Sequence, residues 1–401
     1  MKIGIVTTWF ERGAAYVSRQ YMEALQENNE VFIYARGGEE FGKENEKWDL
    51  PNVTWGVKYG VGSFKIRKSH LYKWIKKHDL DIILFNEQRE WKIVADVKKD
   101  FEHICIGAYI DYYTEKTINL YDIYDFVLCN TQKHYDVFKG HKQACYLRWG
   151  TDVELFQPRV ASFDQTVFFH SVGMAYRKGT DILVDAFVSG KLYEEAKLIL
   201  HSQIPIERVC GYTKKQLESF GIEVIEETVT APGLYYKGNV YVYPTKLEGL
   251  GLTLYEALAC GLPVITTDFS PMNEVIDNEV GSLVKVSKLY SREDGYYWPM
   301  AECDKDDLIS KMKKYITNKD MIKEQSLKAR KKAVEIYNWS KAKPNIQEAF
   351  SNFHVYPCND DYYKKIVAYS RKESQKPFAD MVKNSSLLYF IYKVLACRNG
   401  A

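Results

Sequence analysis

The sequence lacks the features that mark several common protein classes. Its eight cysteines are widely spaced and include no Cys-x-x-Cys pair, which argues against a zinc site or a redox motif and fits reduced thiols. Lys and Arg (55) nearly balance Asp and Glu (53), so the chain has no overall positive field and we expect no nucleic-acid partner. Internal repeats and low-complexity tracts are missing too. What remains is the composition of a globular protein that recognises its partners locally.

Long apolar segments are also missing. The N-terminus enters a strand pattern at Ile3 without the apolar region and cleavage site of a signal peptide. The longest late apolar stretch, residues 387–396, is interrupted by Lys393 and is shorter than the roughly 20 residues of a membrane-spanning helix. We therefore expect a cytoplasmic protein.

Short apolar segments alternate with longer helical patterns, such as 180–188, along the 401 residues. This alternation predicts parallel sheets flanked by helices, and its two successive sets predict two Rossmann-like domains. The expected strands are 3–8, 31–35, 81–85, 103–107 and 125–129 in the first set, and 166–172, 197–201, 239–243, 263–266 and 282–286 in the second.

The predicted boundaries are 1–158 for the first domain, 164–338 for the second and 339–401 for a helical crossover and tail. Residues 305–350 have the pattern of Lys-rich helices, interrupted near 337–340. For the basic tail from 357 we favour a helix packed back on the first domain. Peripheral contact with the inner membrane face is the alternative.

The segment 240–268 has the pattern of a strand, a glycine turn, a helix and a strand. Gly249 and Gly251 allow a tight turn, and the helix that begins near Leu252 directs free N–H groups at it, which suits a phosphate. Glu256 stands alone among apolar residues one turn into this helix, so it needs a partner, and ribose hydroxyls would suit it. Glu248 precedes the turn and is placed to accept hydrogen bonds from other hydroxyls. The alternative is that Glu256 merely favours the positive helix end and that Glu248 is a loop charge.

Two cations, Arg177 and Lys178, stand where the strand 166–172 leads into the next helix. Positive charge is unfavourable at a helix start unless an anion lies between the cation and the helix, and a diphosphate would serve. An exposed charged turn is the alternative.

The run from Glu248 to Ile265, EGLGLTLYEALACGLPVI, resembles the Glu-x7-Glu signature of family 4 (GT4-type) retaining glycosyltransferases. The resemblance implies a GT-B fold, in which an acceptor domain (1–158) and a nucleotide-sugar donor domain (164–338) face a central cleft and C-terminal helices cross back to the first domain. It implies catalytic roles for Glu248, Lys178, Arg177 and Asp111. Donor binding then falls to Glu256 at the ribose, to the turn formed by Gly249, Leu250, Gly251, Leu252 and Thr253, and to Gly13.

The chain departs from this family pattern at three places. The arginine that the family carries after the strand's glycine is Met174 here, so Arg177 would substitute from another position, while Lys178 matches. The histidine that precedes the aspartate of the first domain is Ile110, and Asp111 would keep part of that role. Gly13 is a single glycine in a loop that usually has two, and an ordinary tight turn is the alternative.

The predicted function is retaining transfer of a sugar from a nucleoside-diphosphate sugar, with UDP favoured, to a glycan, lipid-linked or other hydroxyl acceptor in polysaccharide or glycoconjugate synthesis. We expect no metal and no further cofactor. The sequence shows no paired carboxylates, no Gly-x-Ser-x-Gly elbow and no His-Glu-x-x-His. The alternatives are a nucleotide-sugar-binding protein without catalysis, which Met174 and Ile110 favour, and another GT-B enzyme such as an epimerase.

Overall fold

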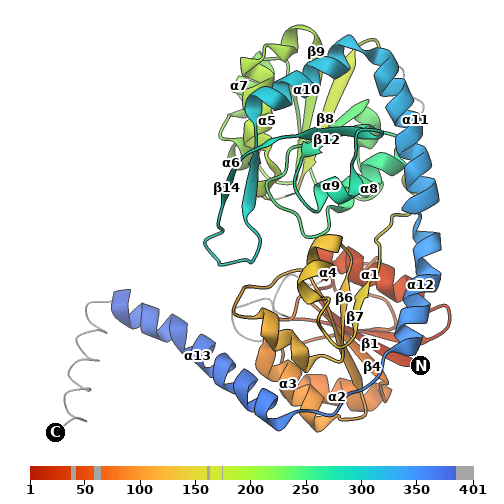
Figure 1. The fold of residues 1–401 in the computed structure, drawn as a ribbon, viewed down its shortest axis with the longest axis vertical. Helices are drawn as coiled ribbons and strands as arrows, with labels where there is room; N and C mark the ends of the chain where they lie inside the picture. Colours follow the sequence, from red (N-terminus) through yellow and green to blue (C-terminus); the bar gives the residue numbers. More distant parts are fainter. Residues whose placement is uncertain (38–41, 58–64, 160–162, 174, 385–401) are drawn as a thin grey trace.

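The computed structural model describes residues 1–37, 42–57, 65–159, 163–173 and 175–384. Met174 lies outside these ranges. Within them the chain forms two α/β bodies, one above the other, and the helices α11 (Lys319–Ile336) and α12 (Trp339–Asn352) run along one side of both (Figure 1). The predicted pair of Rossmann-like domains is confirmed.

The first domain is built on a parallel sheet of seven strands in the order β3-β2-β1-β4-β5-β6-β7. All residues of β4 and β5 are buried, as expected for central parallel strands covered by helices on both faces. The strands are β1 (Lys2–Thr7), β2 (Glu30–Ala35), β3 (Val53–Trp55), β4 (Ile82–Asn86), β5 (Cys105–Tyr109), β6 (Phe126–Cys129) and β7 (Ala144–Tyr146), and the helices are α1 (Gly13–Leu25), α2 (Lys68–His78), α3 (Trp91–Asp100), η1 (Ile118–Ile123) and α4 (Gln132–Phe138).

The second domain is built on a parallel sheet of six strands in the order β10-β9-β8-β11-β12-β13. Its strands are β8 (Thr166–Val172), β9 (Ala196–Ser202), β10 (Glu223–Glu226), β11 (Val240–Tyr243), β12 (Val264–Thr267) and β13 (Gly281–Val284). Its helices are η2 (Tyr176–Lys178), α5 (Thr180–Ser189), η3 (Leu192–Glu194), α6 (Glu207–Cys210), α7 (Lys214–Ser219), η4 (Tyr235–Lys237), α8 (Leu252–Ala259) and α9 (Met272–Val275).

An antiparallel hairpin, formed by β14 (Val286–Tyr290) and β15 (Met300–Cys303), follows β13 and was not predicted. It reaches from the second domain towards the first (Figure 1), where the backbone N–H of Tyr297 donates to the carbonyl of Tyr113 at 2.9 Å. Ring stacking adds a contact between Tyr296 and Tyr112, with centroids 5.2 Å apart. The hairpin therefore bridges the two domains directly.

The C-terminal helices are α10 (Lys305–Thr317), α11 (Lys319–Ile336), α12 (Trp339–Asn352) and α13 (Asp360–Asn384). α11 packs on α8 of the second domain, and α12 packs on α1 of the first, so the predicted crossover is confirmed (Figure 1). The start of α13 packs against α3, with Ile366 fully buried, which agrees with the favoured prediction for the tail. No helix in the described ranges is both long enough and apolar enough to cross a membrane.

Candidate active site

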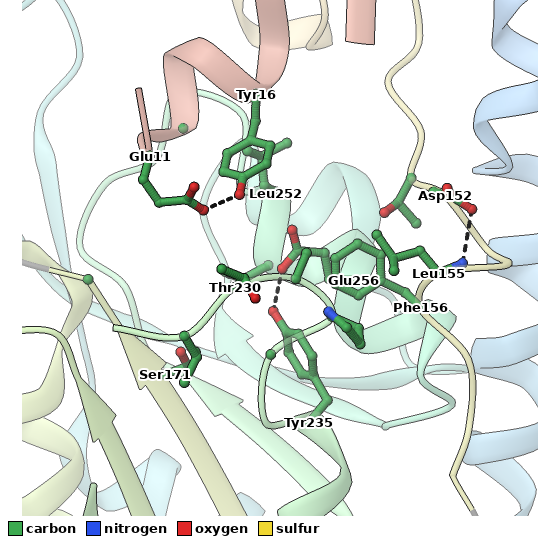
Figure 2. Close-up of a pocket in the computed structure, with 18 of the residues that line it drawn as sticks. Glu11, Tyr16, Asp152, Leu155, Phe156, Ser171, Thr230, Tyr235, Leu252 and Glu256 are labelled. Carbon is green, nitrogen blue, oxygen red and sulfur yellow. Dashed lines mark hydrogen bonds between the residues drawn. The ribbon is translucent and has the colours of Figure 1, made fainter. Parts of the chain in front are cut away.

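A cavity of about 510 Å³ lies between the two domains. Gly13, at the start of α1, lines it from the first domain. Tyr16 of the same helix lines it too (Figure 2). Ser171 at the end of β8 and Leu252 at the start of α8 line it from the second. The carboxyl ends of both parallel sheets thus open towards one cavity, which is where open α/β sheets bind ligands.

Glu256 points into this cavity from α8 (Figure 2). The Tyr235 hydroxyl donates a hydrogen bond of 2.6 Å to Glu256 Oε2. Burial raises the pKa of the Glu256 carboxyl, and the bond from Tyr235 offsets part of that rise. Tyr235 is thus the protein partner that this isolated carboxylate required, and it leaves the second oxygen of Glu256 facing the cavity.

The glycine turn forms as the sequence predicts. Gly251 is the N-cap of α8 in a left-handed conformation, with φ of 78°, and no side chain caps the helix. Leu252 and Thr253 line the cavity, whereas Leu250 is buried in the apolar core. The first turn of α8 therefore presents its N–H groups beside the cavity, a favourable place for an anion.

Glu248, just before the turn, is almost fully buried in a polar cluster. Lys178 Nζ lies 2.6 Å and Arg177 Nη1 3.1 Å from its Oε1, which also accepts hydrogen bonds from the hydroxyls of Tyr243 and Thr245, both at 2.8 Å. Burial alone would raise the pKa of Glu248, but the two cations lower it to about 2. Glu248 is therefore ionised.

Burial and the neighbouring Arg177 lower the pKa of Lys178 to about 8. Sequence reasoning required an anion next to the two cations, and in this structure Glu248 supplies it. Gly179, the N-cap of α5, holds this arrangement, because a Cβ there would collide with the carbonyl oxygen of Pro244 and φ is 76°. Arg177 also donates to the carbonyl of Leu247, so the basic pair is tied to the segment that leads into the turn.

The predicted first-domain residues lie across from this turn. A Cβ on Gly13, the first residue of α1, would lie 3.9 Å from Leu252 Cδ1 of the second domain. Asp111 contacts the turn itself, since a Cβ on Gly249 would collide with Asp111 Oδ1. Ile110, the residue at the expected histidine position, is fully buried in the hydrophobic core of the first domain. Met174 falls outside the described residues.

One sequence interpretation is wrong: the chain does have paired carboxylates. Glu87, directly after β4, hydrogen-bonds to Asp111 after β5. These strands are neighbours in the sheet, so their ends meet at one edge, although the two residues are 24 positions apart and form no sequence motif. Knowledge of the strand order would have been needed to pair them.

Sequence reasoning also missed two residues of α4 that contact the glycine turn. Lys133 Nζ lies 3.4 Å from the carbonyl oxygen of Glu248, and burial lowers the Lys133 pKa to about 8. His134 Nε2 lies 3.2 Å from the carbonyl oxygen of Gly249, and burial lowers the His134 pKa to about 3, so its ring is neutral. The backbone N–H groups of Gln132 and Lys133 donate to the Glu274 carboxylate of the second domain at 2.7 and 2.9 Å. These contacts hold the domains together around the turn.

The structure therefore divides the predicted site residues into two groups, one on each side of the glycine turn. Gly13, Leu252, Thr253 and Glu256 line the cavity. Lys178, Arg177 and Glu248 form the charged cluster, with Gly249 and Asp111 in contact beside it. In the described ranges, no three His, Cys, Asp or Glu side chains gather in a way that could hold a metal ion.

Residues 164–298, which include the turn, match the family model described as glycosyl transferases group 1. A lipopolysaccharide core biosynthesis mannosyltransferase of Rhizobium meliloti is 27% identical over 169 residues, covering 36% of this chain and 47% of the relative. The second domain of the chain is therefore similar to the group 1 glycosyltransferases. The match spans about half the length of that curated relative, and the family model covers only residues of the second domain.

Solved structures agree with a GT-B fold for this chain. A sucrose-phosphate synthase from Thermosynechococcus elongatus superposes with a TM-score of 0.68 at 16% identity, covering 88% of this chain and 98% of that one. The Anabaena protein HepE, in complex with UDP and glucose, superposes with a TM-score of 0.68 at 15% identity, covering 88% and 100%. At these identities the likeness concerns the fold alone, but it extends over both domains.

Proposed function

We propose that this chain is a retaining glycosyltransferase that moves a sugar from a nucleoside-diphosphate sugar to a hydroxyl acceptor in cell-surface polysaccharide or glycoconjugate synthesis. One observation carries the proposal: the uncapped start of α8 lies between a cavity that holds Glu256 and a cluster that holds Lys178 and Arg177. A ribose on Glu256 would place its diphosphate at the helix start, and the cations lie on the far side.

The chemistry that suits this arrangement is departure of the nucleoside diphosphate. The bond between the sugar's anomeric carbon and the diphosphate oxygen breaks, and the electron pair stays on the diphosphate. Lys178, Arg177 and the N–H groups of α8 would stabilise that charge. The acceptor oxygen bonds to the anomeric carbon on the face that the diphosphate leaves, and the acceptor's proton passes to the departing phosphate oxygen. In this scheme the residues supply charge and orientation, without a metal.

Donor binding would also change the partners of Glu248. Two cations now neutralise its carboxylate, with Lys178 at 2.6 Å. A diphosphate that attracts Lys178 and Arg177 would weaken those ion pairs and leave Glu248 to accept hydrogen bonds from the donor sugar. In this way, binding of the donor's diphosphate would make Glu248 available to the donor's sugar.

UDP is our preferred donor nucleotide, supported by the HepE complex with UDP, whereas the name of the Rhizobium relative points to mannose as a sugar to test. The experiment is a panel of UDP-, GDP- and ADP-sugars, assayed for release of nucleoside diphosphate with and without a chelator. Release from one donor class, unchanged by the chelator, is the expected result. Tight UDP binding in calorimetry without release from any donor would favour the non-catalytic binding protein instead.

A further inference from the structure

Glu87 lies at the position in the first sheet where ligands bind most often in such folds. It follows β4, which pairs with β1, and β1 pairs on its other side with β2. The strand order therefore changes direction between β1 and β4, and open α/β sheets bind ligands outside the strand ends at this switch point. Glu87 occupies the β4 side of that crevice, and Arg12 and Gly13 follow β1 on the other side.

The backbone of Glu87 is held in an unfavourable conformation. Its φ is 50°, in the left-handed region that residues with a side chain rarely adopt. Arg36 Nη1 donates to the carbonyl oxygens of Glu87 and Asn86, at 2.7 and 2.9 Å, and so fixes the backbone there. Strained conformations of this kind cluster at functional sites, where the surrounding structure maintains them.

The Glu87 carboxyl is only partly satisfied, although its side chain is just 11% exposed. Its Oε2 atom is buried and has no hydrogen-bond partner among the described residues. Arg12 Nη2 lies 4.0 Å away, beyond hydrogen-bond distance, and Arg12 also lines the cavity between the domains. Glu87 itself lines a separate small cavity of about 10 Å³, which has room for about one oxygen atom. Buried polar atoms nearly always have a partner, so the unpaired oxygen indicates that a small polar group completes it there.

The pair that Glu87 forms with Asp111 faces the second domain, because Asp111 also contacts Gly249. Burial and then the charge of Asp111 raise the pKa of Glu87 to about 7. Glu87 therefore gains or loses its proton near neutral pH, and in its protonated form it can donate a hydrogen bond as well as accept one. Several charged and titratable groups face the pair. They are Arg12, Arg36, Tyr109 and Tyr121 from the first domain, Lys133 from α4, Arg177 from the second domain and, from the interdomain hairpin, Tyr296.

We propose that Glu87, paired with Asp111, binds the hydroxyl group of a neutral sugar acceptor and positions it for attack. The inference rests on the proposed function, since it names the acceptor subsite of that reaction. The second domain supplies the groups suited to the nucleotide and diphosphate, whereas Glu87 stands on the opposite, first-domain face. Glu87 does not take the proton of the acceptor hydroxyl, which goes to the departing diphosphate, so Glu87 acts by orientation.

The test is Glu87→Gln, compared with Glu90→Gln as a matched control. Glu90 is three residues further along and accepts a hydrogen bond from the Ile66 backbone at 2.9 Å. For Glu87→Gln we expect the KM for a sugar acceptor to rise about tenfold, with the donor KM and UDP affinity unchanged. The wild-type acceptor KM should also vary with pH around 7, and Glu87→Gln should remove that dependence.

The possible failures are distinguishable. If the wild type releases no nucleoside diphosphate from any sugar nucleotide, the proposed function fails and takes this inference with it. If the wild type is active but Glu87→Gln raises the donor KM instead, the hydroxyl belongs to the donor sugar and the acceptor assignment is overturned. An unchanged acceptor KM and pH profile, with UDP binding showing that the variant is folded, would also overturn it.

Discussion

On the second-domain face of the cleft, opposite charges neutralise one another. On the first-domain face, one oxygen of the Glu87 carboxyl has no hydrogen-bond partner within the part of the chain that the structure describes. Glu248 has two cations and two hydroxyls within 3.1 Å. Glu87 has an ion-pair distance of 4.0 Å to Arg12 and a second carboxyl as its hydrogen-bond partner. The first arrangement is ready to exchange one anion for another, and the second is ready to gain a neutral polar ligand.

The two faces also differ in how the chain assembles them. On the second-domain face, Glu248 and Glu256 lie on one turn and one helix, eight residues apart. On the first-domain face, Glu87 and Asp111 come from the ends of two different strands. We infer that the second-domain face supplies the charge that drives departure and the first-domain face supplies orientation, and variants on each face can test this division.

The largest effect should come from Lys178→Ala. Loss of a cation beside the developing diphosphate charge should lower turnover about 100- to 1,000-fold, as expected when one group that stabilises a transition-state charge is removed. Lys246→Ala is the matched control, because Lys246 is also buried and pairs with Asp181 at the same 2.6 Å. Steady-state release of nucleoside diphosphate measures both. Equal losses in the two variants would mean that Lys178 matters only as a buried ion pair.

A smaller effect, on binding, is expected from Glu256→Gln. The charged acceptor facing the cavity becomes a neutral amide, so UDP should bind about tenfold more weakly in calorimetry, with little change in turnover at saturation. Glu23→Gln is the control, since Glu23 lines the same cavity from α1 and pairs with Arg19 at 3.2 Å. If Glu256→Gln lowered turnover and left UDP affinity intact, the ribose assignment would have to be abandoned.

Two glycines offer a direct comparison of the faces. Gly249→Ala should lower turnover about tenfold, because its Cβ would collide with Asp111 Oδ1 and shift the contact between the domains. Gly13→Ala should change turnover less, because its Cβ would meet only Leu252 Cδ1 at 3.9 Å, an ordinary contact. The measurement is the turnover and the acceptor KM of the two variants. A larger loss for Gly13→Ala would indicate that a ligand passes close to Gly13, as the glycine-loop interpretation holds.

The difference between the faces explains which parts of the site could be predicted from sequence. Glycine, helix and strand signals place Glu248, Gly251 and Glu256 within one continuous segment, and the structure arranges this segment as expected. The fold could be predicted from the same kind of local signal. Apolar runs mark β8 and α5, and Gly179 marks the start of α5.

Contacts between residues far apart in the sequence could not be predicted, because no local sequence pattern marks them. Glu87 meets Asp111 only because β4 and β5 are neighbours, and Lys133 meets the turn only because the domains approach each other. The hairpin formed by β14 and β15 was missed because its first strand is mostly exposed and lacks an apolar run. The sequence did not identify Glu248 as the anion beside Lys178 for the same reason, because the two residues are 70 positions apart.

The smallest effect concerns pH. The Lys178 pKa of about 8 means that this residue is charged below that pH and loses its proton as pH rises through it. Because kcat/KM reports the free enzyme, kcat/KM for the donor should fall about twofold between pH 7 and pH 8. Lys178→Arg should remove this fall of kcat/KM at high pH, since a guanidinium stays protonated. Lys133 also has a pKa of about 8, so Lys133→Arg is the necessary control. Suppose that Lys133→Arg removed the fall of kcat/KM and Lys178→Arg did not. The cation that donor binding requires would then lie on the first-domain face, and the division of roles between the faces would be reversed.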